Sequence, residues 1–237
     1  MRVALQTEIA DENAAGPRRD HPKPHLRLID ATTRPSARQA LPRLAVILSA
    51  DTVNYTRHMA ADEAGTHARC TAIRRGVIEP GIADHDARIV KHTGDGFLAE
   101  FQSATRAVWF AVMFQHALRA WNVRRRRGAR IEFRVGINLG DVIVEAHDLF
   151  GHSVNVAARL QAMAGPGDVL VSHAVFASVR DTRLRFEDAG ALSLKNVDEP
   201  VHGFRARLAA VRRPARMGRA TGLEPVTSRT TTWRSAN

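Results

Sequence analysis

Two aspartates, Asp51 and Asp95, stand at positions from which their carboxylates can meet. Asp51 ends an apolar run, residues 44–50, that has the character of a buried strand. Asp95 lies at the corner between two short apolar segments of residues 89–101, where its Asp-Gly pair is typical of a hairpin turn. Carboxylates at a strand end and a hairpin tip can converge on a hard cation such as Mg²⁺. Each also has a purely structural interpretation, Asp51 as a helix cap and Asp95 as a turn residue.

The composition bounds the class of protein. A chain of 237 residues is long enough for one large domain or two small ones. Cys70 is the only cysteine, which excludes a disulfide framework and a cysteine-based zinc site and favours a reducing compartment. No apolar run approaches the roughly twenty residues that cross a bilayer, and the N-terminus lacks the apolar region of an export signal. We expect a cytoplasmic protein without a membrane span.

The net charge of +11 is concentrated outside the central region. Residues 1–40 carry +2 and residues 208–237 carry +5, which leaves +4 for residues 41–207. The basicity therefore says little about what the folded part binds, and we expect no nucleic-acid partner. Residues 1–42 are expected to be a disordered, basic and proline-rich lead-in, and residues 208–237 a disordered, arginine-rich tail.

Between these flanks, apolar periodicity predicts alternating strands and helices. Strands are predicted at 44–50, 88–101 (a hairpin), 130–138 and 141–146 (joined by a turn at Leu139-Gly140), 169–171, 185–187 and 201–207. Helices are predicted at 55–78 (ended by Pro80-Gly81), 103–122 (capped by Ser103), 152–165 and 174–179. This order predicts an α+β fold, with one sheet and its helices on one face.

Five short segments carry a resemblance to a known family. They are residues 49–56 (SADTVNYT), 91–96 (KHTGDG), 135–140 (VGINLG), 150–159 (FGHSVNVAAR) and 194–196 (LKN). In this order and spacing they resemble the catalytic domain of class III nucleotide cyclases of the bacterial adenylate cyclase type, over about residues 43–207. The resemblance implies a ferredoxin-like cyclase catalytic domain, with a central, mostly antiparallel sheet and flanking helices. It also implies conversion of ATP to 3′,5′-cyclic AMP and pyrophosphate.

The resemblance assigns the metal ligands. Asp51, the backbone carbonyl of Thr52 and Asp95 match the positions that hold two Mg²⁺ or Mn²⁺ ions per site. One ion would lower the pKa of the ribose 3′-hydroxyl, and the other would hold the triphosphate. The 3′-oxygen would then attack the α-phosphate in line, a reaction that depends mainly on positioning and charge stabilisation.

Three further residues match the family's catalytic and phosphate-binding positions. Asn155 and Arg159 are four residues apart and so share one face of a helix. The resemblance implies that Asn155 orients the ribose and Arg159 neutralises charge at the α-phosphate, a task that suits a guanidinium group. Lys195 matches a lysine that contacts the terminal phosphates. Without the resemblance, all three fit equally well as exposed surface residues.

The choice of base is inferred from Lys91 and Asp148, which match the positions that read the purine edge. Adenine presents an acceptor at N1 and a donor at its 6-amino group, which a lysine donor and an aspartate acceptor complement. Guanine reverses both groups and would leave the pair mismatched. The pair therefore favours ATP. Its structural alternative is an ordinary strand-end lysine and a turn aspartate.

In the resembled family each active site is shared between two catalytic domains. One chain holding the whole set therefore implies a homodimer with two equivalent sites. Two positions depart from the common pattern: Asn54 and Asn196 stand where many relatives have glycine. Asn54 lies in a loop expected near phosphate, while Asn196 is less disruptive because asparagine tolerates left-handed backbone angles. No sensor, transmembrane or receiver domain is recognisable, and the sequence does not identify a regulator.

Three other functions compete with an adenylate cyclase. A guanylate cyclase is disfavoured by Lys91 and Asp148. A catalytically silent domain that binds nucleotide and acts through dimerisation stays open because of Asn54 and the unusual flanks. A nucleic-acid binder on a ferredoxin-like sheet would need exposed aromatic residues on its central strands. Aromatic residues are few, and those on the predicted strands are expected in the core: Phe97, Phe101 and Phe133.

Overall fold

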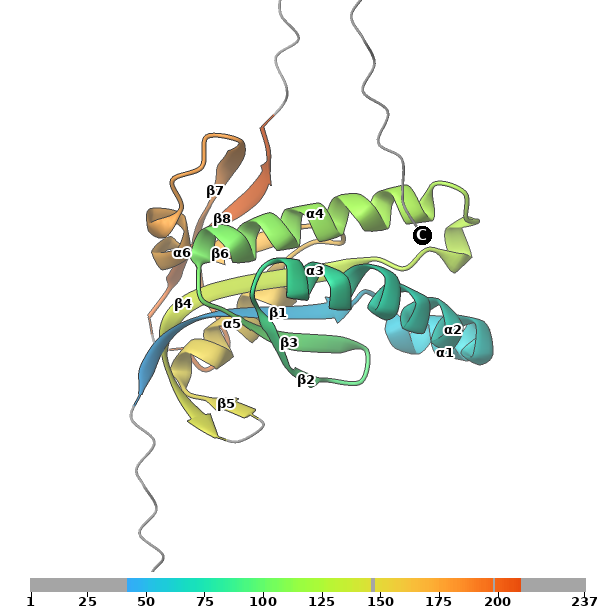
Figure 1. Cartoon of the computed structure of the whole chain (residues 1–237), viewed down its shortest axis with the longest axis horizontal. Helices are drawn as coiled ribbons and strands as arrows, with labels where there is room; N and C mark the ends of the chain where they lie inside the picture. Colours follow the sequence, from blue (N-terminus) through green and yellow to red (C-terminus); the bar gives the residue numbers. More distant parts are fainter. Residues whose placement is uncertain (1–41, 146–147, 198, 210–237) are drawn as a thin grey trace, which may run out of the picture. The chain divides into compact units, whose positions relative to one another are not determined.

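The computed structural model describes residues 42–145, 148–197 and 199–209. Apart from residues 42, 208 and 209, the expected lead-in and tail lie outside the described residues. The described part forms a mixed sheet flanked by helices, which confirms the α+β class (Figure 1). In the part of the chain that the structure describes, no helix is both long and apolar enough to cross a membrane.

The sheet has eight strands, in the spatial order β2-β3-β1-β4-β6-β8-β7, with β5 paired to β4. Their bounds are β1 (Arg43–Thr52), β2 (Arg88–His92), β3 (Gly96–Phe101), β4 (Phe133–Glu145), β5 (Asp148–Phe150), β6 (Val169–Ser172), β7 (Leu184–Leu192) and β8 (Val201–Leu208). All neighbouring pairs are antiparallel except β4 and β6. The predicted central position of the first strand is confirmed, because β1 lies between β3 and β4.

The helices connect these strands. They are α1 (Tyr55–Ala61), α2 (Glu63–Ile73), the π-helical turn η1 (Arg74–Ile78), α3 (Glu79–Asp84), α4 (Ala104–Asn122), the 3₁₀ turn η2 (Arg127–Ala129), α5 (His152–Met163) and α6 (His173–Ser178). The cap of α4 is confirmed, since the Ser103 hydroxyl accepts a hydrogen bond from the Arg106 N–H at 3.4 Å. The expected core aromatics Phe97, Phe101 and Phe133 are all buried.

Helices cover both faces of the sheet, so the prediction that they lie on one face is wrong. Along β1, Val46 and Leu48 belong to the core that contains α4, while Ala45 and Ile47 belong to the core that contains Ala157 of α5. Successive side chains of a strand point to opposite faces, so β1 is buried on both sides. Figure 1 accordingly shows α4 in front of the strands and α5 behind them.

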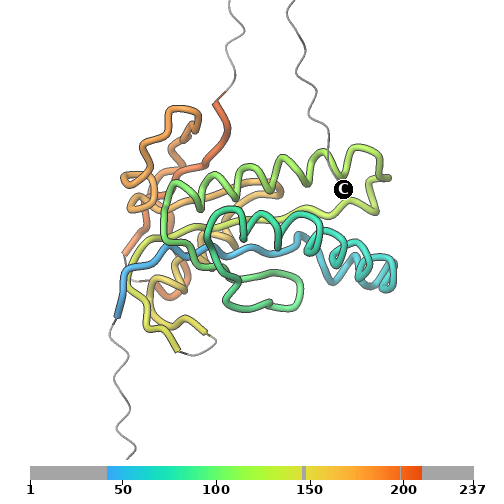
Figure 2. Tube along the Cα trace, in the orientation of Figure 1, coloured from blue at the N-terminus to red at the C-terminus, as the bar shows by residue number. Residues whose placement is uncertain are grey.

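The predicted turn at Leu139-Gly140 does not exist. Both residues lie inside the continuous strand β4 and pair with Val46 and Ala45 of β1. Gly140 is required for a different reason, because a Cβ atom there would lie 2.3 Å from the Ser153 hydroxyl of α5. Because Gly140 has no side chain, α5 can pack closely against β4 at this position. The yellow hairpin of β4 and β5 extends beyond the sheet at the lower left of Figure 2.

Two smaller boundaries also differ from prediction. The helix expected over 55–78 is interrupted at Asp62, whose carboxylate caps α2 by accepting the Gly65 N–H at 2.9 Å. It then continues past Pro80, which lies in the first turn of α3 directly after the π-helical turn η1. In the hairpin, Gly94 adopts the left-handed backbone (φ 84°), and Gly96 begins β3.

Candidate active site

The metal-ligand candidates Asp51 and Asp95 are brought together by the pairing of β1 with β3. Asp51 lies opposite Gly96 in the antiparallel ladder, so Asp95 comes next to it in space. Thr52 fixes this arrangement, since its N–H and its hydroxyl both donate to the Asp95 carbonyl, at 3.2 and 2.6 Å. Two carboxylates from distant segments therefore open into one pocket of about 570 Å³.

Gly96 makes the close approach of these strands possible. A Cβ atom at this position would lie 2.1 Å from the backbone carbonyl oxygen of Ala50. No side chain can be accommodated there unless β3 moves away from β1. The glycine after Asp95 is therefore a packing requirement of the carboxylate pair, in addition to being part of a hairpin.

The two carboxylates, Asp51 and Asp95, repel each other when both are ionised and no cation is bound between them. Burial raises the pKa of Asp95, the neighbouring Asp51 carboxylate raises it further, and Arg134 lowers it. Two adjacent carboxylates with free oxygen atoms fit Mg²⁺ or Mn²⁺, which prefer oxygen ligands. Within the described residues, no three His, Cys, Asp or Glu side chains are grouped so that they could hold a metal ion together. Further ligands would be backbone carbonyls, phosphate oxygens or water.

Arg134 is the main site residue that the sequence interpretation missed. It lies directly opposite Asp51 in the β1–β4 ladder, and its Nη2 donates to Asp51 Oδ2 at 2.7 Å. Its buried Nε has no hydrogen-bond partner among the described residues, which leaves one donor available for an anion. An arginine between the buried residues Phe133 and Val135 was the signal that could have revealed it.

The two residues proposed to read the base are in direct contact. Lys91 Nζ of β2 donates to Asp148 Oδ2 of β5 at 2.6 Å, and the other carboxylate oxygen accepts the Leu149 N–H at 2.7 Å. The Lys91 hydrogen bond lowers the pKa of Asp148, so this carboxyl stays an acceptor at neutral pH. Both side chains are partly exposed, at 44% for Lys91 and 27% for Asp148, and so remain accessible to a ligand.

The remaining candidates lie on α5 and on the loop between β7 and β8. Asn155 is exposed and Arg159 is half-buried on α5, while Lys195 is exposed in the loop. The first turn of α5 is held by the buried side chain of Asn138, whose amide donates to the Ser153 carbonyl at 3.1 Å. Asn138 thus positions the helix that carries Asn155 and Arg159.

These candidates divide into two groups within one chain. The pocket of Asp51 and Asp95 is also lined by Thr52, Asn54 and Arg134. None of the other candidates lines it: Lys91, Asp148, Asn155, Arg159 or Lys195. A single chain therefore does not enclose the full set in one pocket.

The two departures from the family pattern have a backbone explanation. Asn54 and Asn196 both adopt left-handed backbone angles, with φ of 55° and 59°. Asparagine is among the few residues that tolerate this region at low cost, which explains how it can replace glycine at both positions. Asn54 also lines the pocket of the carboxylate pair, so its side chain borders the space that a phosphate would enter.

Comparison with solved structures agrees with this architecture. The adenylate/guanylate cyclase/hydrolase from Silicibacter pomeroyi superposes with a TM-score of 0.65 at 39% identity, covering 70% of this chain and 96% of that one. An adenylate cyclase of Trypanosoma brucei, solved in its monomeric state, gives a TM-score of 0.60 at 22% identity, covering 69% and 89%. The second likeness concerns the fold alone. The fold is that of a nucleotide cyclase catalytic domain.

Sequence comparison identifies the family. The profile described as "Adenylate and Guanylate cyclase catalytic domain" matches residues 45–205. The protein named putative adenylate cyclase 3 of Rhizobium meliloti is 46% identical over 161 residues, covering 68% of this chain and 27% of that protein. The chain belongs to the class III adenylate and guanylate cyclase family, as its motifs predicted. It spans about a quarter of the length of the curated relatives that it matches first.

Proposed function

We propose that this chain is an adenylate cyclase that converts ATP to 3′,5′-cyclic AMP and pyrophosphate. The observation that carries the choice of ATP is the contact of Lys91 with Asp148. Their donor and acceptor complement the N1 acceptor and the 6-amino donor of adenine. Guanine has a donor at N1 and an acceptor at O6, the reverse of adenine, so this pair would leave polar groups unpaired in a complex with guanine. The related protein of Rhizobium meliloti is also named as a putative adenylate cyclase.

The reaction forms a bond between the ribose 3′-oxygen and the α-phosphorus. The bond from that phosphorus to the oxygen bridging to the β-phosphate breaks, and its electron pair leaves with pyrophosphate. The 3′-hydroxyl proton is released to solvent water. Two Mg²⁺ or Mn²⁺ ions, held by Asp51, the Thr52 carbonyl and Asp95, would activate the 3′-hydroxyl and bind the triphosphate.

The chain's own residues position the nucleotide and stabilise its charge. Asn155 orients the ribose, Arg159 neutralises the charge that develops at the α-phosphate, and Lys195 contacts the terminal phosphates. Arg134 balances the charge of Asp51 in the free protein. Its Nε has no hydrogen-bond partner among the described residues, so Arg134 would be a further donor to a phosphate oxygen bound in this pocket.

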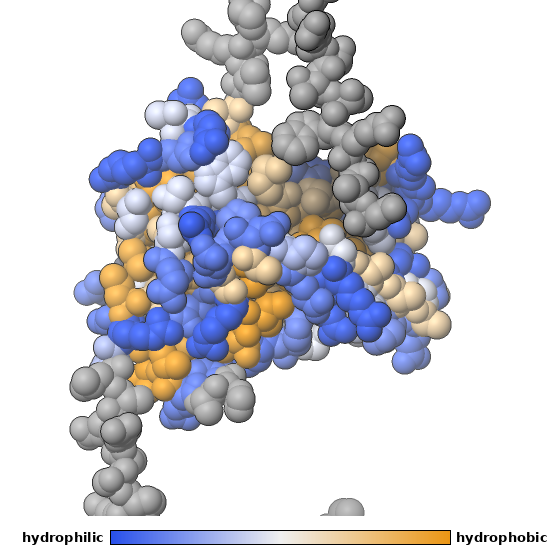
Figure 3. Space-filling view, in the orientation of Figure 1, coloured by the Kyte–Doolittle hydropathy of each residue, from blue (hydrophilic) through white to orange (hydrophobic). Residues whose placement is uncertain are grey.

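We infer that the active enzyme is a homodimer with shared sites, formed by residues 43–207. One chain separates the metal-ligand candidates from the base, ribose and phosphate candidates, so a second copy would complete each site. An exposed apolar surface is available for such pairing: Ile143 and Phe150 lie opposite each other across β4 and β5 and are 39% and 45% exposed. Figure 3 also shows apolar surface at its lower left, and Leu44 near the start of β1 is 64% exposed.

Product formation by the purified chain tests the proposal. With Mn²⁺ and either ATP or GTP, at concentrations where the chain is dimeric, we expect cyclic AMP as the main product. Asp95→Ala should abolish it, whereas the control Asp84→Ala, an exposed aspartate at the end of α3, should retain it. Preferential use of GTP would indicate a guanylate cyclase. No product from a dimer that binds Mn²⁺ and nucleotide would indicate a catalytically silent domain.

A further inference from the structure

A second polar cavity, of about 330 Å³, lies between α4 and the ends of β6 and β8. We call it the α4–β8 pocket, and its polar lining is Gln115, His116, Arg119, Gly167, Asp168 and Arg207. None of these residues lines the pocket of Asp51 and Asp95. Its volume lies at the small end of the range for small-molecule sites, so it suits a small ligand rather than a polymer.

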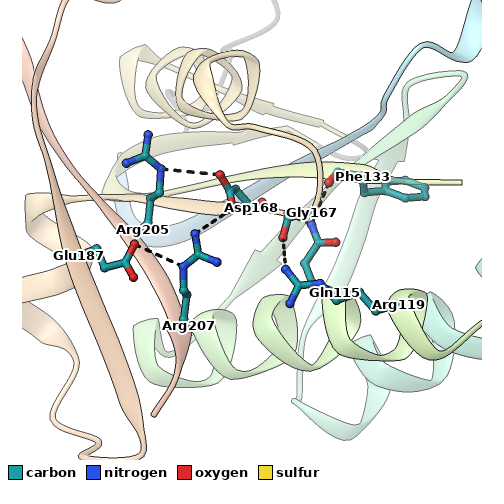
Figure 4. Close-up of polar contacts among 8 residues, drawn as sticks. All are labelled: Gln115, Arg119, Phe133, Gly167, Asp168, Glu187, Arg205 and Arg207. Atoms are coloured by element: carbon teal, nitrogen blue, oxygen red, sulfur yellow. Dashed lines mark hydrogen bonds and ion pairs between the residues drawn. The ribbon is translucent and has the colours of Figure 1, made fainter. Parts of the chain in front are cut away.

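The charges around this pocket are predominantly positive. Arg119 contacts the Gly167 carbonyl, Arg205 and Arg207 both contact the Asp168 carboxylate, and Arg207 also contacts Glu187 (Figure 4). Arg119 extends from α4 and Arg207 from β8, so two of the cations belong to different walls of the cavity. Of the residues that line the pocket, Arg119, Arg207 and Asp168 therefore carry an excess of one positive charge.

The arginine contacts are too long to use the full donor capacity of these side chains. Arg119 Nη2 lies 3.4 Å from the Gly167 carbonyl, and Arg207 lies 3.4 Å from both Asp168 and Glu187. Charge-assisted hydrogen bonds are typically about 2.7–2.9 Å long, and each guanidinium group has about five N–H donors. Arg119 and Arg207 thus retain donors for an oxyanion between them.

The base of the pocket is rigid. The buried Gln115 amide donates to the Phe133 carbonyl at 3.0 Å and to the Asp168 carbonyl at 3.3 Å. The Gly167 N–H donates to the same Phe133 carbonyl at 2.9 Å. These bonds fix the loop before β6 against both α4 and β4, so the walls are in place before any ligand arrives.

We propose that the α4–β8 pocket binds a small anion through a phosphate group, held between Arg119 and Arg207. Guanidinium groups meet phosphate oxygens in pairs, and two of them on opposite walls can share one tetrahedral group. The ion pair with Asp168 orients the Arg207 side chain along the β8 wall of the pocket. The phosphate is either free or part of a small metabolite. This assignment does not depend on the cyclase reaction.

Amide chemical shifts of the isotope-labelled full chain test the proposal without nucleotide or metal. Inorganic phosphate, added at constant ionic strength, should shift the Gly167 and Asp168 resonances in a saturable way. The double variant Arg119→Gln with Arg207→Gln should weaken binding by about tenfold or more. Arg205→Gln is the matched control, because Arg205 contacts Asp168 at 3.7 Å but does not line the pocket, and it should retain the affinity within about twofold.

Two further titrations identify the source of the phosphate. Tighter binding of glycerol phosphate than of inorganic phosphate would indicate a phosphorylated metabolite, and the reverse would indicate the free ion. Acetate that binds as tightly as either would overturn the assignment to phosphate. The proposal is also overturned if the shifts occur only around the Asp51–Asp95 pocket, or if the double variant, still folded by its spectrum, binds like the unchanged chain.

Discussion

Lys91 Nζ lies 2.6 Å from the Asp148 carboxylate, although 57 residues separate them in the chain. One comes from β2 and the other from the short strand β5, which pairs with β4. The proposed base-reading donor and acceptor are therefore assembled before a nucleotide binds. In the free protein each side chain is the hydrogen-bond partner of the other.

Exchanging the two charges tests the base assignment. Lys91→Glu combined with Asp148→Lys keeps an ion pair but reverses donor and acceptor, so it should favour guanine. The ratio of kcat/KM for ATP over GTP should fall by about tenfold or more, as expected for mismatched polar groups. Thermal unfolding serves as the control, since an exposed pair contributes only about 0.2–1 kcal/mol. An unchanged ratio in a folded variant would mean that other residues read the base.

Replacing Asp95 by asparagine should stabilise the metal-free protein at neutral pH. The pKa of Asp95 is raised above its ordinary value of 3.8, first by burial and then by Asp51. The native state therefore binds the proton more tightly than the unfolded state, so stability falls as pH rises from about 4 through the raised pKa. Asp95→Asn removes this loss.

Urea unfolding of both proteins across this pH range, in the presence of a chelator, measures the effect. The two stability curves should separate increasingly as pH rises, with the variant above. With saturating Mn²⁺ the order should reverse, because only the unchanged protein gains stability from the bound cation. Parallel curves in chelator would show that the Asp95 carboxylate carries no electrostatic cost in the native state.

Adding one methyl group at Gly96 should impair the carboxylate pair. The new Cβ would lie 2.1 Å from the Ala50 carbonyl, so β3 must move and carry Asp95 away from Asp51. We expect Gly96→Ala to lose about 1–3 kcal/mol of stability and most of its Mn²⁺ affinity, measured by urea unfolding and calorimetry. Gly128→Ala is the control, because nothing lies within 4 Å of its added Cβ. Equal Mn²⁺ affinity in both variants would contradict the packing argument.

Mixing two inactive variants tests whether the sites are shared. Asp95→Ala removes a proposed metal ligand, and Arg159→Ala removes a proposed phosphate ligand. If each site takes its metal ligands from one chain and its phosphate ligands from the other, a mixed dimer contains one site with neither change. With free exchange, half of the dimers are mixed, and activity should return to about one quarter of the unchanged protein. Asp95→Ala is preferable to Asp51→Ala because Asp51 also pairs with Arg134.

The matched control for this experiment is a mixture of Asp95→Ala with Asp51→Ala. Both changes affect the metal half, so every dimer in this mixture lacks an intact site and should stay inactive. If mixed dimers are demonstrated in the first mixture and activity still fails to return, the shared-site proposal is wrong.

Local signals were sufficient to predict the elements that flank the carboxylate pair. The apolar run of β1, the short hairpin of β2 and β3 and the Ser103 cap of α4 each depend on nearby residues, and the structure contains all of them. The convergence of Asp51 and Asp95 also followed from this local pattern, because a strand end and a hairpin tip were correctly recognised.

Features that depend on distant contacts could not be predicted in the same way. Gly140 was interpreted as a turn residue, yet it is glycine because α5 packs against it. The role of Arg134 depends on the register between β1 and β4, which places it opposite Asp51. Periodicity assigns a residue to a strand face but does not determine which element covers that face, so the prediction placed all helices on one face of the sheet.

The buried amide of Gln115 also has a mechanical consequence. It ties α4 to the carbonyl of Phe133, the residue before Arg134, and to the carbonyl of Asp168, which accepts the N–H of Val135, the residue after Arg134, at 3.2 Å. A displacement of α4 would therefore be passed, through this side chain among other contacts, to the backbone on either side of Arg134, whose guanidinium group contacts Asp51. A molecule that bound to α4 would therefore act on the Asp51–Arg134 pair without entering the pocket that this pair lines.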